Sequence, residues 1–307
     1  MSFQRSLALT VRALRLRLIT RPMLVRYAQA LDAGGLLLLL PVIARAIASF
    51  RDAGALAIIN YASKLVELPL GVCVTVLAVV LFPRLAEAFA TPGGQDQGDR
   101  MLSDGIVLVV VLGCAISIPF MWFAPDVSRL VFGVGKMPES ALVEVGALAA
   151  IGIVSLPAQG LSSMIVAAFN ARRDMAAPLA TNLLAIVSFA LAGWWAFGAW
   201  GLPGLMVAMT AVFYGTAALQ VAAYSARWGT QGFGLSMAVS ALKTVVVMGL
   251  AFIPFAAIGG HLANMWLRTG LAALATGVLL SIGFGLQPQL RAYATAALRR
   301  IRRSAGE

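Results

Sequence analysis

The hydrophobic positions of this chain form long runs that are separated by short polar segments. Each run is long enough for a helix to cross a hydrocarbon core of about 30 Å, which needs about 20 apolar residues. The pattern predicts eight membrane-spanning helices and an all-α, polytopic bundle. The predicted spans are approximately 24–50, 58–83, 104–124, 142–169, 176–196, 203–225, 236–257 and 264–286.

Composition agrees with this pattern, since 61% of the residues are hydrophobic and only 11% are charged. Soluble domains have about 25% charged residues. The net charge of +11 raises the question of nucleic-acid binding. The basic residues flank the apolar runs instead of gathering with aromatic residues on a polar face, so we expect no nucleic-acid partner.

One predicted span carries a stripe of polar residues. Asn60, Lys64, Glu67 and Gly71 fall within a narrow arc of one helix face. Such a stripe is either paired inside a bundle or lines a wet cavity. Lys64 and Glu67 are therefore candidate binding residues, and the alternative is an ion pair that holds the bundle together.

The first predicted span contains two further charges, Asp32 and Arg45. They are 13 residues apart, so they cannot pair within one helix. Each requires a partner elsewhere, water or a lipid head group, and both are candidates for the same cavity. Prolines within or near the ends of the spans predict kinks that favour a moving bundle. These prolines are Pro41, Pro69, Pro83, Pro119, Pro157 and Pro254.

The distribution of basic residues predicts the topology. An even number of spans places both termini on one side of the membrane. That side carries 17 of the 23 Lys and Arg residues, and the other side carries five. The remaining one, Arg45, lies inside the first predicted span. The positive-inside rule then places both termini in the cytoplasm. Lys64 and Glu67 would lie in the outer half of the membrane.

Four segments follow from these predictions. Residues 1–22 form a basic amphipathic helix on the cytoplasmic membrane face, or a flank that only sets topology. Residues 23–227 form a six-helix membrane lobe, and residues 228–288 form two further membrane helices. Residues 289–307 form a basic cytoplasmic tail.

No motif for catalysis, a metal or a cofactor is present. His261 is the single histidine, and the cysteines Cys73 and Cys114 lie in separate apolar runs. We therefore expect neither an enzyme nor a cofactor. Arg172, Arg173 and Asp174 are interpreted as topology and loop-capping residues.

Three segments of the chain carry recognisable motifs. The first contains Ala-Ser-Phe at 48–50, a glycine at 54, Tyr-Ala-Ser-Lys-Leu at 61–65, Glu-Leu-Pro-Leu-Gly at 67–71 and Leu-Phe-Pro-Arg-Leu at 81–85. The other two are residues 132–136 and 169–178. In their order and spacing these segments resemble the MurJ/MviN lipid II flippase family of the MOP superfamily. The family's Asp-Arg pair is Ser63-Lys64 in this chain. A lysine attracts a diphosphate as a point charge but lacks the guanidinium fork.

The resemblance implies half of a MOP/MATE-like two-lobe transporter, namely the second lobe and the final two helices. It implies a multi-pass protein of the bacterial inner membrane that flips an undecaprenyl-diphosphate-linked saccharide, either lipid II-like or an exopolysaccharide repeat. The partners would be membrane lipid, this lipid-linked sugar, and a six-helix partner lobe or a second copy. Lys64 would contact the diphosphate and Glu67 would hold Lys64 or exchange partners. The alternatives are a non-transporting scaffold in a cell-envelope polysaccharide pathway, a degenerate half-flippase, or a truncated product.

Overall fold

The computed structural model describes residues 35–50, 53–76, 81–229, 235–288 and 290–291, and within these ranges every regular element is helical. A short 3-10 turn, η1 (Leu36–Leu38), precedes the first long helix. The helices are α3 (Leu39–Ser49), α4 (Ala53–Val76), α5 (Phe82–Ala90), α6 (Gln95–Phe132), α7 (Glu139–Ile153), α8 (Leu156–Ala171), α9 (Ala176–Trp228), α10 (Leu235–His261) and α11 (Met265–Leu286). The predicted amphipathic helix at 1–22, Asp32 and the tail beyond Arg291 lie outside the described residues.

Five of the described helices, α4, α6, α9, α10 and α11, are long and apolar enough to cross a membrane. The bent pair of α7 and α8 makes a sixth if the two helices are counted as one broken span, and η1 with α3 forms a shorter apolar helix. The label α9 covers two helices, which correspond to two of the predicted spans. They are joined by a turn at Gly201, whose φ is 66°. The described helices thus overlap the predicted ranges, of which residues 24–34 and 77–80 are not described.

The two halves of α9 pack against each other as an antiparallel hairpin. The side chain of Gln220 donates a hydrogen bond to Asn182 Oδ1 at 3.0 Å, although the two residues are 38 positions apart. Nearer the turn, a Cβ at Gly193 would lie 3.2 Å from a methyl group of Leu205. The absence of a side chain at Gly193 thus allows the two halves to approach closely.

Two element boundaries differ from the predicted ones. The span predicted to begin at residue 104 is part of α6, which already begins at Gln95. At its other end α6 continues to Phe132, well past the predicted limit at 124. Hydropathy marks only the part of a helix that lies in the hydrocarbon core, and a helix can continue into water with polar residues. The predicted span 58–83 includes most of α4 and the first residues of the amphipathic α5, and residues 77–80 between them are not described.

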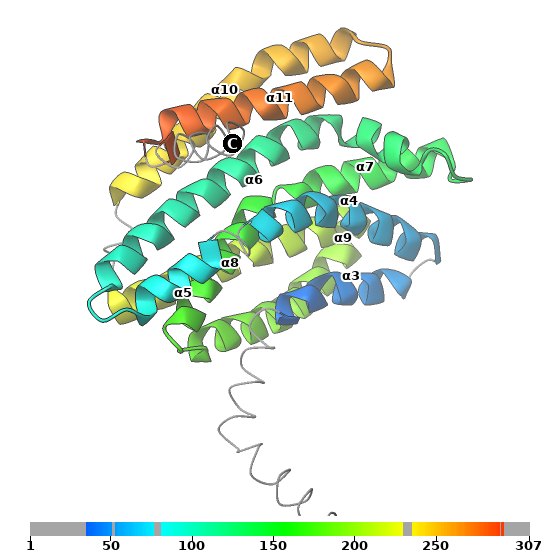
Figure 1. Cartoon of the computed structure of the whole chain (residues 1–307). Helices are drawn as coiled ribbons and strands as arrows, with labels where there is room; N and C mark the ends of the chain where they lie inside the picture. Colours follow the sequence, from blue (N-terminus) through cyan, green and yellow to red (C-terminus); the bar gives the residue numbers. More distant parts are fainter. Residues whose placement is uncertain (1–34, 51–52, 77–80, 230–234, 289, 292–307) are drawn as a thin grey trace, which may run out of the picture.

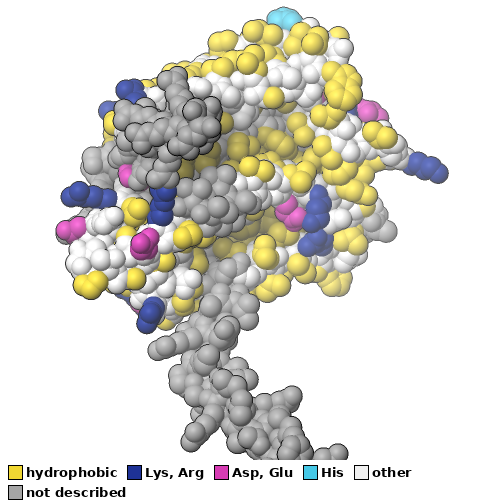
Figure 2. All heavy atoms as spheres, viewed as in Figure 1, with side chains coloured by type: hydrophobic (Ala, Val, Ile, Leu, Met, Phe, Trp, Pro, Cys, Tyr) yellow, Lys and Arg dark blue, Asp and Glu magenta, His cyan; other side chains and the backbone are white. Residues whose placement is uncertain are grey.

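Helices α10 and α11 run side by side along α6, on one flank of the bundle (Figure 1). Buried Phe123, Met248 and Leu279 form the apolar contact between these three helices. The same interface contains Asp126, whose side chain is only 3% exposed and whose Oδ2 lies 3.1 Å from Nε of Arg268 on α11. On the face shown in Figure 2, hydrophobic side chains cover the middle and many charged side chains lie toward the two ends. This distribution is the one that a membrane-spanning bundle requires.

The bend between α7 and α8 measures 42°. Pro157 lies in the first turn of α8 and has no N–H to donate to the carbonyl of Ile153, four residues earlier. Side-chain hydroxyl groups bind the four consecutive carbonyls at this break. Thr210 donates to Ile151 O at 3.3 Å, Ser155 to Gly152 O at 2.6 Å, Ser117 to Ile153 O at 2.8 Å and Tyr214 to Val154 O at 2.9 Å. Because lipid cannot satisfy a free carbonyl, these hydroxyls make the break tolerable inside a membrane.

Candidate functional site

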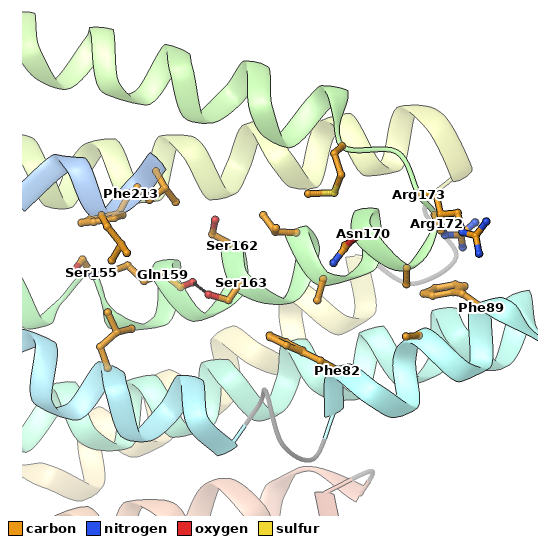
Figure 3. Close-up of a pocket in the computed structure, with 18 of the residues that line it drawn as sticks. Phe82, Phe89, Ser155, Gln159, Ser162, Ser163, Asn170, Arg172, Arg173 and Phe213 are labelled. Carbon is orange, nitrogen blue, oxygen red and sulfur yellow. Dashed lines mark hydrogen bonds between the residues drawn. The ribbon is translucent and has the colours of Figure 1, made fainter. Parts of the chain in front are cut away.

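A large cavity lies between α4, α5, α8 and the second half of α9. Its volume is about 1220 Å³, and η1 and α3 contribute Leu37, Leu38 and Pro41 to its wall. Phe82 and Phe89 of α5 face the labelled residues of α8 across it (Figure 3). The cavity is thus built from helices that are far apart in the sequence.

One face of α8 supplies most of the polar lining. Ser155, Gln159, Ser162, Ser163 and Asn170 all line the cavity. They recur at helical spacing, so they form one stripe along the helix, and Figure 3 shows them in sequence along α8. The first part of this stripe is hydrogen-bonded within itself, since Gln159 Nε2 donates to Ser155 Oγ at 2.7 Å. The spacing of these residues in an otherwise apolar run was readable from the sequence, but it was not identified there.

The polar stripe is also fixed to the α9 hairpin. Ser162 Oγ donates to Gln220 Oε1 at 2.6 Å, and Gln220 in turn donates to Asn182. All three side chains are buried. Since the chain of hydrogen bonds joins α8 to both halves of α9, it holds the cavity wall in position.

The structure brings the described candidates from the sequence together in two pairs. Lys64 Nζ lies 2.5 Å from Glu67 Oε2, with the side chains 54% and 37% exposed. Arg45 Nη1 donates to Asn60 Oδ1 at 3.0 Å, which joins α3 to α4. Glu67 is the one of these four residues that lines the cavity within the described part of the chain. The fifth candidate, Asp32, lies outside the described residues.

Ser63 occupies the position where the family resemblance places an aspartate. Its side chain lines the cavity and is 3% exposed. Its hydroxyl is among the buried groups without a hydrogen-bond partner in the described structure. The residue next to Lys64 therefore offers the cavity a neutral hydroxyl instead of a carboxylate.

Arg172 forms a cluster at the C-terminal end of α8 that sequence reasoning missed. Its Nη2 lies 2.7 Å from Asp99 Oδ1, and Tyr224 donates to the same oxygen at 2.9 Å. The guanidinium lies over the ring of Phe89, 4.3 Å from its centre, and 4.8 Å from the ring centre of Trp228. The cluster joins α5, α6, α8 and α9. Its partners are distant in the sequence, so no local pattern indicated it.

The prediction that residues 172–174 cap the loop is consistent with the backbone. The N–H of Arg173 donates to Asn170 O at 2.9 Å, and the N–H of Asp174 donates to Phe169 O at 3.0 Å. These two bonds form a Schellman motif that ends α8. The side chains of Arg172 and Arg173 also line the cavity, so their role is not confined to the loop.

Comparisons with known proteins agree with this fold. The family described as "Lipid II flippase MurJ" matches residues 18–277. A probable lipid II flippase MurJ of Rhizobium tropici is 29% identical over 153 residues, which cover 50% of this chain and 28% of that protein. A probable lipid II flippase MurJ of Rhizobium meliloti is 29% identical over 133 residues, 43% of this chain and 24% of that protein.

A solved structure of a lipid II flippase MurJ in an inward closed conformation also matches. The TM-score is 0.62 at 14% identity, over 81% of this chain and 51% of that one. This likeness shows the fold. The chain spans about a quarter of the curated relatives in the matched regions and about half of the solved structure.

Proposed function

Because this chain belongs to the lipid II flippase MurJ family, we propose that it forms one side of a path that moves a polyprenyl-diphosphate-linked saccharide across a membrane. The substrate is lipid II-like or an exopolysaccharide repeat on the same carrier. The observation that carries this proposal is the cavity of about 1220 Å³, with a polar stripe on α8 inside an apolar bundle. A hydrophilic sugar requires such a polar surface to pass a hydrocarbon core.

Lys64 is the proposed contact for the diphosphate. Its side chain is more than half exposed, and its ion partner Glu67 lines the cavity. An exposed ion pair contributes only about 0–1 kcal/mol, so a ligand can replace Glu67 at Lys64 at little cost. An incoming diphosphate would replace Glu67 as the partner of Lys64, and Glu67 would recover Lys64 after release.

Arg45 and Asn60 have a supporting role in this proposal. Their hydrogen bond of 3.0 Å joins α3 to α4 one turn before Lys64. Asn60 and Lys64 are four positions apart, so they lie on one face of α4. The bond therefore orients the helix face that presents Lys64.

The rest of the cavity wall is proposed to come from a six-helix partner lobe or from a second copy of this chain. In this arrangement residues 23–227 form one lobe and residues 228–288 add two helices. The distribution of basic residues supports a position in the bacterial inner membrane with both termini in the cytoplasm.

The test is transport of fluorescent lipid II in inverted membrane vesicles from cells that make the full chain, alone and together with the first lobe of a relative. We expect Lys64→Ala to lower the rate by about tenfold or more, since it removes a charge-assisted contact with the diphosphate. Lys64→Arg should retain most of the rate. Lys136→Ala is the matched control, because Lys136 is also exposed but, unlike Lys64, forms no ion pair with a residue of the cavity wall in the described structure. A Lys64→Ala variant that transports at the wild-type rate, at matched membrane levels, would refute the role of Lys64.

The second candidate function is the non-transporting scaffold. The Lys64–Glu67 ion pair favours it, because the two charges satisfy each other without a ligand. If the wild-type chain moves no lipid in either vesicle preparation yet co-purifies with a polysaccharide synthase, the scaffold replaces the transporter.

A further inference from the structure

Three charged side chains line the cavity in the described part of the chain, and two of them have an ion partner. Glu67 pairs with Lys64 at 2.5 Å, and Arg172 pairs with Asp99 at 2.7 Å. The third is Arg173, which is exposed and forms no ion pair among the described residues.

Arg173 forms no ion pair with the carboxylates of its own loop, of α5 or of the start of α6 in the described structure. Asp174 is paired with Arg227. Glu87 of α5 and Asp96 of α6 are exposed and are not part of the cavity wall. Of the three charged side chains that line the cavity in the described part of the chain, Arg173 is therefore the one without an ion partner.

The backbone of Arg173 is unusual and supports a role for its side chain. Its φ is 57°, the single positive φ among described residues other than glycine. This is the position of a Schellman motif where glycine is favoured, because a Cβ is strained there. A glycine would close α8 at lower cost, so the loop itself does not require an arginine. An unfavourable backbone conformation that persists is evidence of a local function.

The surroundings of Arg173 suit an anion. Figure 3 shows Arg172 and Arg173 together at the end of the cavity beside Phe89. Gln95, the first residue of α6, lines the same cavity. The first N–H groups of a helix have no partner within it and attract negative charge. The cavity wall also includes apolar Phe82, Val166 and Met175.

We infer that Arg173 binds the diphosphate of an amphiphilic, polyprenyl-linked ligand at the α8 end of the cavity, as a loading position separate from Lys64. The identity of the ligand rests on the proposed function. The chemistry of the site rests on the free arginine, the α6 terminus and the apolar wall. A ligand held there has its charged group at Arg173 and enters the cavity toward Glu67.

The experiment measures binding of undecaprenyl diphosphate to the purified full chain in nanodiscs of zwitterionic lipid. Arg173→Gly is the central variant, because it removes the charge and at the same time relieves the backbone. We expect its Kd for undecaprenyl diphosphate to rise about tenfold, as for loss of one charge-assisted contact, while its Tm stays equal to or above the wild-type value. Arg173→Lys should lose less affinity for undecaprenyl diphosphate, because it keeps the positive charge. The matched control is Arg100→Ala, since Arg100 is also exposed, lies on α6 at the same end and does not line the cavity.

Two further probes separate the sources of the anion. Undecaprenol, which has no phosphate, should bind weakly to all variants. Phosphatidylglycerol should bind without dependence on Arg173. If Arg173→Gly weakens the binding of phosphatidylglycerol but not that of undecaprenyl diphosphate, the site holds lipid head groups and the inference is overturned.

The inference is also overturned if the wild type does not bind undecaprenyl diphosphate, if Arg173→Gly binds it as the wild type does, or if Arg100→Ala loses as much affinity. Its failure is distinguishable from failure of the proposed function. Binding that depends on Arg173 in a chain that moves no lipid supports the site and contradicts transport. Wild-type transport with unchanged binding by Arg173→Gly contradicts the site alone.

Discussion

The break between α7 and α8 offers a direct test of how the bundle is held together. Ser117 of α6 donates to the carbonyl of Ile153 at 2.8 Å, and Pro157 cannot supply the usual N–H to that oxygen. Ser117→Ala removes the hydroxyl and almost no volume, so the carbonyl loses a partner in a buried position. An unsatisfied buried polar group costs about 1–3 kcal/mol, and hydrogen bonds measured within membranes fall at or below the lower part of that range. We expect Ser117→Ala to lower the free energy of unfolding by about 1–2 kcal/mol.

The assay is reversible unfolding in bicelles, with Ser281→Ala as the control. Ser281 also donates to a carbonyl, Gly277 O at 2.9 Å, but that carbonyl lies within the regular part of α11. Loss of the Ser281 hydroxyl should therefore change the free energy of unfolding by less than about 0.5 kcal/mol. Equal effects of the two substitutions would refute the claim that Ser117 replaces the missing N–H of Pro157.

A double-mutant cycle sharpens the test. Pro157→Ala restores an N–H that can bind Ile153 O, so Ser117→Ala should cost less in that background. Additive effects would mean that the serine and the proline act on different groups.

Two other predictions concern how the helices are joined. Asp126→Asn removes the carboxylate between α6 and α11 and leaves Arg268 without its ion partner. The substitution should lower the free energy of unfolding by about 3 kcal/mol and raise protease cleavage between α10 and α11. The control is Glu139→Gln, an exposed position, which should cost less than about 1 kcal/mol. Gly201 has φ 66° and ψ −148°, a backbone conformation that residues with a Cβ rarely adopt, and nothing lies within 4 Å of the added Cβ, so strain alone should make Gly201→Ala cost about 1–3 kcal/mol. Gly198→Ala, with similar space and no positive φ, should have little effect on unfolding. A destabilised Gly198→Ala would show that space, not the φ angle, limits this turn.

The sequence by itself determined the class of fold and the positions of the spans. A helix enters lipid because of its own apolar composition, which is a local property that a window of residues contains. The kink predicted at Pro157 is local for the same reason, since the missing N–H belongs to that residue. The stripe of Asn60, Lys64 and Glu67 was also readable, because helical spacing alone places those residues on one face.

The tertiary structure decided which polar groups meet. Arg45 pairs with Asn60 on the next helix, and Arg172 pairs with Asp99, which is 73 positions away. Such partners depend on how helices pack, and helix packing depends on shape along whole faces and not on local composition. For the same reason Glu67 reaches the cavity wall while Arg173, interpreted from sequence as a loop residue, lies at its end.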